Sequence, residues 1–189
     1  MNHGINKLKL FRALYFPLMV IFAASFFAGQ GWAKVKKTEP VSDMVISEPK
    51  PVEDIEFLDG AGETRKLSES EGNVRIVNFW ALWCFPCKEE MPSLAKLQAD
   101  YKDKGLKIIP LANGTDGAEQ IKNFYKKNHI DALDIFIDDG NKNFKTFTLK
   151  GLPTSIIINK KGEEVARISG YNDWESKKTK DFIEKLLAE

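Results

Sequence analysis

The sequence predicts an α/β fold with a mixed central sheet flanked by helices. The apolar run 74–80 leads into the chain's only two cysteines, Cys84 and Cys87, and a helical pattern follows them. Beyond this point short apolar strands alternate with amphipathic helices, which favours helices on both faces of a sheet. The segments at the two ends of the series resemble antiparallel hairpins, so we expect the sheet to be mixed rather than wholly parallel.

The N-terminal part of the predicted domain is a β-hairpin followed by the strand that leads to the cysteines. The hairpin strands are expected at 55–58 and 63–67, around the glycine-containing loop 59–62. Residues 68–73 are polar and typical of a turn. The helix after the cysteines is predicted from apolar side chains spaced three or four positions apart: Met91, Leu94, Leu97 and Tyr101.

The C-terminal half continues the alternation of strands and helices. Pro110 cannot donate to a ladder, so we expect a bulge, an edge or a strand end there. A last helix should begin at the N-cap Asp173 and bury Phe182, Ile183, Leu186 and Leu187. The other expected elements are strands at 106–111, 133–137, 155–158 and 164–169, and helices at 118–128 and 141–149.

The N-terminus has the pattern of a targeting segment. Lys7, Lys9 and Arg12 precede an uncharged apolar run, 13–29, as in a positive n-region and an h-region. Small residues allow cleavage after Ala33, yet the run is also long enough for a short membrane span of ~17 residues. We therefore expect a signal or membrane anchor at 1–33. Its basic residues should stay cytoplasmic, which places the rest of the chain outside.

A flexible linker is predicted at 34–52, where three prolines interrupt a charged segment, and the globular domain is predicted at 53–189. The whole chain has 28 basic and 27 acidic residues, and residues 1–33 contain three of the basic ones and no acidic one. The remainder therefore carries 25 against 27, a net charge of −2. That balance argues against a nucleic-acid partner, which calls for a basic patch.

The cysteine pair allows three interpretations. Structural zinc needs about four ligands, and the only histidines, His3 and His129, are far away along the chain. A structural disulfide closing so short a loop would stabilise the fold by only about 2 kcal/mol. A redox-active pair is favoured, because strand, Cys-x-x-Cys and helix follow one another and tryptophan flanks the first cysteine. This chemistry requires neither a metal nor a further cofactor.

The position of Cys84 at a predicted helix N-terminus suits disulfide exchange. Unpaired backbone N–H groups and the helix dipole stabilise negative charge there. The thiolate is the nucleophile in exchange, so Cys84 is the expected attacking residue. Cys87, one turn further on, is expected to be more buried and to resolve the mixed disulfide.

Three segments carry a resemblance to a known family. Asn78-Phe-Trp-Ala-Leu-Trp-Cys-Phe-Pro-Cys-Lys-Glu-Glu-Met-Pro92 resembles the active site of the exported thioredoxins of the TlpA/ResA/DsbE type. Gly151-Leu-Pro153-Thr resembles their cis-proline loop, and 165–174 is similar to the TlpA-type thiol:disulfide interchange proteins in particular. The resemblance covers about residues 53–188 and implies a thioredoxin fold. Within it, the helix and strand expected at 118–137 resemble the TlpA/ResA-type insertion.

The resemblance implies roles for the residues around the cysteines. Cys84 and Cys87 form the redox disulfide, and Pro153 is cis and leaves the backbone of Leu152 free to pair with an extended substrate. Glu90 either assists deprotonation of Cys87 or, as the alternative, is an ordinary acid at a helix start beside Glu89. The residues expected to contact substrate are Trp83, Phe85, Pro86, Leu152 and Pro153.

Other positions near the cysteines are assigned smaller roles. Asn78 matches a position where thioredoxins have a buried acid, and we interpret it as a hydrogen-bonded core residue rather than a catalytic one. Leu82 stands where many TlpA-like proteins have threonine, and it should add apolar surface beside Cys84. Phe85, between the cysteines, also varies among relatives and influences the redox potential. Trp83 is expected to shield the sulfurs, and Trp80 to pack beside the site.

Three functional hypotheses follow. The favoured one is a periplasmic thiol–disulfide reductase, anchored to the bacterial inner membrane or released after Ala33, that acts on cytochrome c or copper-site maturation clients. By resemblance, a membrane thiol carrier of the CcdA or DsbD kind would re-reduce it. The second hypothesis is an oxidase or isomerase of the same fold. The third is a copper(I)-binding chaperone, although Met44 and Met91 are the only methionines outside the leader.

Overall fold

The computed structural model describes residues 44–189, so the predicted signal or anchor and the first part of the linker lie outside the described residues. From residue 44 the linker prediction is wrong, because Met44–Pro51 form strand β1 and pair with strand β8, Glu163–Ser169. Prolines and charges, which favoured a linker, are also the residues that edge strands tolerate. A register shift between Ile46 and Lys50 takes Pro49 out of the ladder.

Eight strands of the described residues form one sheet, one strand more than expected, and the sheet is mixed, as predicted. Its order is β1-β8-β7-β4-β5-β6-β2-β3. The β4–β5 and β5–β6 pairs are parallel, and every other pair is antiparallel. Besides β1 and β8 the strands are β2 (Glu56–Asp59), β3 (Thr64–Lys66), β4 (Val74–Trp80), β5 (Leu106–Asn113), β6 (Phe136–Asp138) and β7 (Thr154–Ile158).

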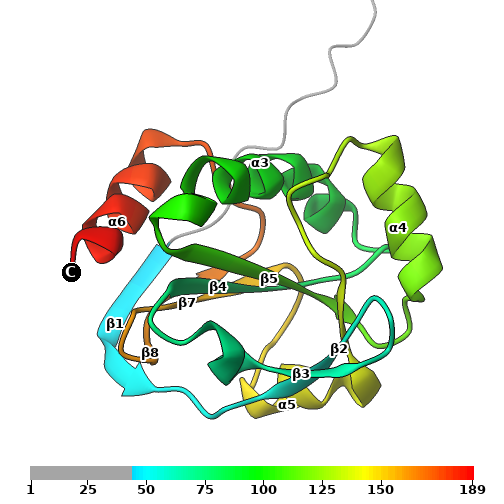
Figure 1. Ribbon diagram of the computed structural model, residues 1–189, viewed down its shortest axis with the longest axis horizontal. Coiled ribbons are helices and arrows are strands. Elements are labelled where there is room, and N and C mark those ends of the chain that lie inside the picture. The colour runs from blue at the N-terminus through cyan, green and yellow to red at the C-terminus, as the bar shows by residue number, and fades with distance from the viewer. Residues whose placement is uncertain (1–43) are drawn as a thin grey trace, which may run out of the picture. The chain divides into compact units, whose positions relative to one another are not determined.

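Helices cover the two faces of the sheet unequally (Figure 1). Three long helices, α3 (Phe85–Tyr101), α4 (Ala118–Lys127) and α6 (Lys177–Ala188), contribute to the core on one face. Among the described residues, only the five-residue α5 (Lys142–Thr146) and its flanks cover the other face, over a core to which β2 of the sheet contributes Phe57. No helix within the described part of the chain is both long and apolar enough to span a membrane.

Strand β4 is the centre of the fold. All seven of its residues are buried, and alternate side chains enter the two cores, as expected for a strand covered on both faces. Ile76 and Trp80 face α3, whereas Val77 and Phe79 face the α5 side. The strand ends at Trp80, so the turn that carries the first cysteine begins at the carboxyl end of β4.

Pro110 lies inside strand β5, in unbroken register with β4, so the expected bulge or strand end is absent, and the expected edge is present only locally, on the side of β5 that faces away from β4. Within the described chain, the side of β5 that faces away from β4 is not paired with a strand before Leu111. The side chain of Gln98 bonds to it there, donating to Leu106 O at 3.0 Å and accepting from Ile108 N at 2.6 Å. Pro110 faces the same side by alternation, and β6 pairs with β5 only from Leu111 on. No ladder partner therefore needs the missing N–H.

Two other boundaries differ from the predictions. β6 begins at Phe136 rather than near residue 133 and ends at Asp138, whose carboxylate accepts from the first N–H groups of α5. The last helix is capped by Ser176, which accepts from Thr179 N, and not by Asp173. Asp173 instead accepts from Glu175 N in the preceding turn, because both residue types form such local bonds.

Candidate active site

Cys84 and Cys87 form a disulfide at the N-terminus of α3, with Sγ atoms 1.99 Å apart. After β4 the chain turns through Ala81–Cys84, where Cys84 N donates to Ala81 O at 3.1 Å. Cys84 is the N-cap of α3. Pro86 lies in the first turn, where its missing N–H would have had no intrahelical partner. The local sequence therefore fixes a rigid turn that opens directly into the helix.

The two sulfurs have different environments. Cys84 is 5% exposed and Cys87 is fully buried. The Cys84 Sγ accepts from Cys87 N at 3.4 Å, so an unpaired N–H of the first helical turn points at it. In the reduced protein this N–H and the helix dipole would stabilise a thiolate on Cys84. Cys84 is therefore positioned to attack and Cys87 to resolve.

The Leu152–Pro153 peptide bond is cis, as the resemblance implies. Thr154 follows at the start of β7 and pairs with Phe79 of β4, so the proline lies beside the carboxyl end of β4, where the active-site turn begins. Gly170 N donates to Pro153 O at 2.8 Å, which ties the loop to the end of β8. Leu152, the residue before the cis-proline, is half-buried.

Glu90 is buried one helical turn after Cys87, with 1% of its surface exposed. Its Oε1 accepts from Asn78 Nδ2 at 2.7 Å, and its Oε2 accepts from Asn172 N at 2.9 Å. Burial raises the pKa of Glu90 to about 7, although these two bonds and the Trp174 indole act to lower it. The alternative of an ordinary acid at a helix start does not fit this buried, hydrogen-bonded carboxyl. Glu90 titrates near neutral pH inside the core.

Asn78 is a core residue that joins three segments. Its Nδ2 donates both to Glu90 and to Ser155 Oγ, at 2.9 Å, while its Oδ1 has no partner among the described residues. Ser155 was not singled out from the sequence, although a serine in a buried strand is a signal that could have been used. Asn172 acts on Glu90 through its backbone, for which the sequence carries no side-chain signal.

Asp116 is a second residue that sequence reasoning missed. Its Oδ2 accepts from Leu82 N at 2.8 Å and so fixes the turn that precedes Cys84. Burial raises the pKa of Asp116, and the Leu82 bond opposes that rise. The loop 113–117 that carries it follows β5, and Gly114 there approaches Asp138 O so closely that a Cβ would lie 2.4 Å away.

The surface around Cys84 is apolar. Trp83 and Phe85 lie on either side of it in the sequence and are 67% and 63% exposed. They are the aromatic residues among the exposed large hydrophobic side chains of the described chain. Trp80 is fully buried and stacks on Tyr125 of α4, with ring centroids 6.0 Å apart. Exposed apolar surface of this kind marks a site for protein contacts.

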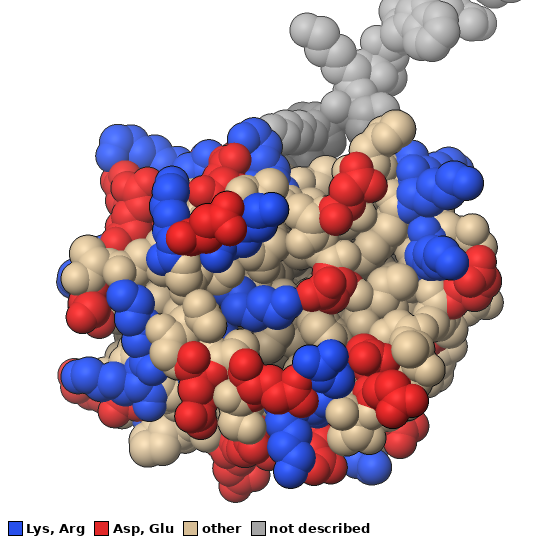
Figure 2. Space-filling model, viewed as in Figure 1, with Lys and Arg blue, Asp and Glu red and all other residues tan. Residues whose placement is uncertain are grey.

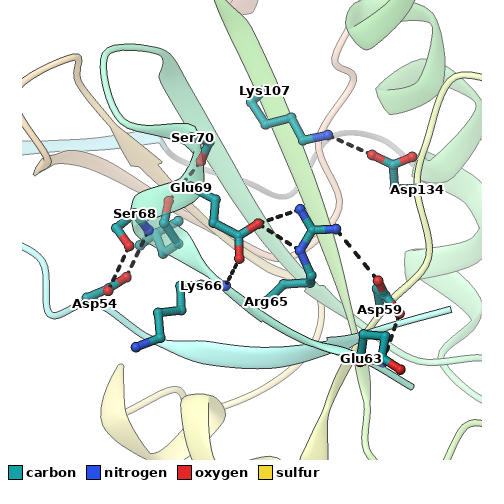
Figure 3. A network of polar contacts seen from close by, with 11 residues as sticks. Asp54, Asp59, Glu63, Arg65, Lys66, Ser68, Glu69, Ser70, Lys107 and Asp134 are labelled. Atoms are coloured by element: carbon teal, nitrogen blue, oxygen red, sulfur yellow. Dashed lines mark hydrogen bonds and ion pairs between the residues drawn. The ribbon is translucent and has the colours of Figure 1, made fainter. Parts of the chain in front are cut away.

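Charges of both signs are interspersed over the face in Figure 2, with no dominant basic patch. A groove of about 720 Å³ lies between the β2–β3 hairpin and β5, away from the disulfide. Two of its cations are paired within it: Arg65 with Glu69 and Asp59, and Lys107 with Asp134 at 2.6 Å (Figure 3). Within residues 44–189, no group of three metal-ligating side chains is assembled.

The fold and this site define a class of protein. A Cys-x-x-Cys disulfide at a helix N-terminus, beside a cis-proline in a thioredoxin-like sheet, is the arrangement of a thiol–disulfide oxidoreductase. The chain belongs to the AhpC/TSA family, whose model matches residues 49–166.

Curated relatives carry the same activity in their names. The thiol-disulfide oxidoreductase ResA of Bacillus thuringiensis subsp. konkukian is 37% identical over 127 residues, which are 67% of this chain and 68% of the relative. ResA of Halalkalibacterium halodurans is 31% identical over 159 residues, covering 84% and 82% of the two chains. A Chlorobium tepidum crystal structure that carries the name thiol:disulfide interchange protein DsbE has a TM-score of 0.64 at 25% identity, over 76% of this chain and 99% of that one.

Proposed function

We propose that this oxidoreductase works as a reductase of client disulfides outside the cytoplasm. The observation that carries the proposal is the asymmetry of the pair. Cys84 keeps 5% of its surface exposed and has an N–H directed at its sulfur, whereas Cys87 is fully buried one turn before Glu90, whose pKa burial raises to about 7. Such a pair attacks with one sulfur and resolves with the other.

The proposed reaction proceeds in two exchanges. The Cys84 thiolate attacks one sulfur of a client disulfide, a mixed disulfide forms, and the other client sulfur leaves as a thiolate. Cys87 then loses its proton and attacks the Cys84 Sγ, which releases the second client thiolate and forms the Cys84–Cys87 disulfide. Two electrons pass from the dithiol to the client, and the protein leaves the cycle oxidised.

Glu90 is the proposed acceptor of the Cys87 proton. It lies three residues after Cys87, on the same side of α3, and its pKa of about 7 leaves much of it ionised near neutral pH. Its hydrogen bonds to Asn78 and Asn172 hold the carboxylate in place. After Cys87 has attacked the mixed disulfide, Glu90 carries the proton, and burial away from water favours this uncharged form of the carboxyl.

The cellular setting is part of the proposal. The basic, apolar N-terminus favours export to the periplasm, with anchoring to the inner membrane or release after Ala33. The resemblance to TlpA-type proteins supports clients in cytochrome c or copper-site maturation, and a CcdA- or DsbD-type membrane carrier as the source of electrons. A net charge of −2 outside the leader supports protein partners rather than nucleic acid.

The test is a trapping experiment with full-length protein in membranes of a bacterial host. Cys87→Ser should hold clients on Cys84 as mixed disulfides that a reducing agent releases. Cys84→Ser is the matched control, because it keeps one cysteine but leaves only the buried one. Specific adducts with Cys87→Ser alone would support the proposal. Equal adducts with both variants, or none with either, would contradict it.

A further inference from the structure

A groove of about 470 Å³ begins at the cis-proline loop. The loop 148–154 forms one wall, and the end of β8 with Gly170 forms the other. A second groove, of about 600 Å³, continues over β8 to β1 and is lined there by Val45, Ser47 and Lys50. We call this second one the β1 groove. The two grooves share Thr148, Arg167 and Ser169 and therefore meet along β8.

The β1 groove is open because α5 is too short to cover the whole face of the sheet. Figure 1 shows α5 on the face opposite α3 and α6, and Asn143 of α5 donates to Glu56 O of β2, toward the edge of the sheet that lies opposite β1. Val45 pairs with Arg167 and lines the groove, where it is 61% exposed. No element of the described chain therefore covers the apolar side chain of Val45.

The floor of the β1 groove is held rigid by Arg167. Its guanidinium donates to both Glu164 oxygens, at 2.9 and 3.0 Å, and to Phe147 O at 2.9 Å. A register shift between β7 and β8 makes this bond possible, because it brings Glu164 to the same face as Arg167. The charge of Arg167 is therefore neutralised within the β1 groove, and its hydrogen bonds fix the shape of the groove floor.

Two other cations remain available to a partner. Lys50, in β1, and Lys150, beside the cis-proline loop, have no ion-pair partner among the described residues. Glu53 is the one unpaired acid that lines either groove. The combined surface therefore offers an apolar contact at Val45 and a small excess of positive charge.

We propose that the two grooves form one extended docking site for the client segment that flanks the reactive cysteine. This inference rests on the proposed reductase function. The occupant is an extended stretch of about six residues, which spans roughly 20 Å. It runs from the cis-proline loop across β8, with an apolar side chain over Val45 and a carboxylate near Lys150. The first groove is lined by Leu152 and Pro153 of the cis-proline loop and shares three residues with the β1 groove, and this continuity from the redox site to β1 favours a client segment over a second copy of this chain.

The test compares two neighbouring positions of β1. Val45→Glu places a charge in the β1 groove. Ile46→Glu is the matched control, because Ile46 is 66% exposed on the same strand but pairs with Ala166 and faces the opposite side of the sheet. Both side chains are mostly exposed, so both variants should fold, which thermal melting would check.

The measured quantity is the rate constant at which pre-reduced protein reduces two substrates. One is a cysteine peptide, linked by a disulfide to a chromogenic thiol, with acidic and apolar flanks of about six residues on both sides. The other is the same capped cysteine without flanks. For the unsubstituted protein and for Ile46→Glu, the flanked peptide should react faster. Val45→Glu should lower the flanked-to-unflanked ratio about tenfold, which corresponds to about 1.4 kcal/mol.

A charge reversal provides the second arm. Lys150→Glu should slow the acidic flanked peptide and favour a version with lysine flanks. Equal ratios for Val45→Glu and Ile46→Glu, with both peptides reduced, would overturn the docking site and leave the reductase function standing. Failure of the unsubstituted protein to reduce either peptide would overturn the reductase proposal, and this one with it.

Discussion

The buried carboxyl of Glu90 should make the stability of the domain depend on pH in a way that one substitution removes. Burial raises its pKa from the usual 4.5 to about 7. A rise of that size corresponds to about 3 kcal/mol between the two protonation states. Because the folded-state pKa is the higher one, the native protein binds the proton more tightly than the unfolded chain. This stabilisation is complete below about pH 4.5 and is lost as the pH rises through about 7.

Glu90→Gln imitates the protonated acid, because one carboxamide oxygen can still accept from Asn78 or Asn172. At pH 4.5 the oxidised variant and the unsubstituted protein should therefore be similar in stability. At pH 8.5 the variant should be more stable by about 3 kcal/mol, since it has no buried charge to desolvate.

The assay is urea unfolding of both oxidised proteins at a series of pH values and constant ionic strength. The difference between the two unfolding free energies cancels the titration of every other group. It should change by about 3 kcal/mol, with its midpoint between pH 4.5 and 7. A difference that stays constant from pH 4.5 to 8.5 would show that Glu90 is not held in a dry environment and would refute the reasoning. Reduced protein would show in addition how the free thiols affect the same titration.

Three further substitutions test residues that hold the active-site turn and strand β5 in place. Each effect is measured by chemical unfolding. Asp116→Ala should leave Leu82 N without its acceptor and cost about 1–3 kcal/mol, whereas Asp116→Asn keeps an acceptor and should lose much less. Equal losses of unfolding free energy in the two variants would contradict a role for this hydrogen bond. Gly114→Ala should destabilise the domain by about 1–3 kcal/mol, because its Cβ would meet Asp138 O at 2.4 Å, and an unchanged midpoint would contradict that contact. Gln98→Met should cost about 2–4 kcal/mol, because it leaves two buried backbone groups of β5 unpaired; a loss below 1 kcal/mol would be evidence against that role.

The sequence was most informative where a local pattern decides the structure. The buried strand 74–80, the N-cap at Cys84 and the helix after it follow from hydrophobic period and helix-end chemistry, and they formed as predicted. The cis bond at Pro153 was a different case. Spacing alone favours trans, and only the family resemblance reversed that expectation.

The parts that the sequence did not reveal depend on distant partners. β1 was interpreted as linker because its pairing with β8 comes from residues more than 110 positions away. Asn172 reaches Glu90 through a backbone N–H, which any residue but proline could supply. Pro110 was expected at a bulge, an edge or a strand end, and it lies within β5 on the side that stays unpaired until β6 begins to pair at Leu111. Export, anchoring and client identity stay predictions.

The most direct test of the reductase proposal is the reduction potential of the Cys84–Cys87 pair, measured by equilibration against a dithiol buffer with tryptophan fluorescence as the signal. The account predicts a potential near the ~−270 mV of thioredoxin, because a reductant must be able to give its electrons to client disulfides. A potential near the ~−120 mV of DsbA would contradict it and make this protein an oxidant.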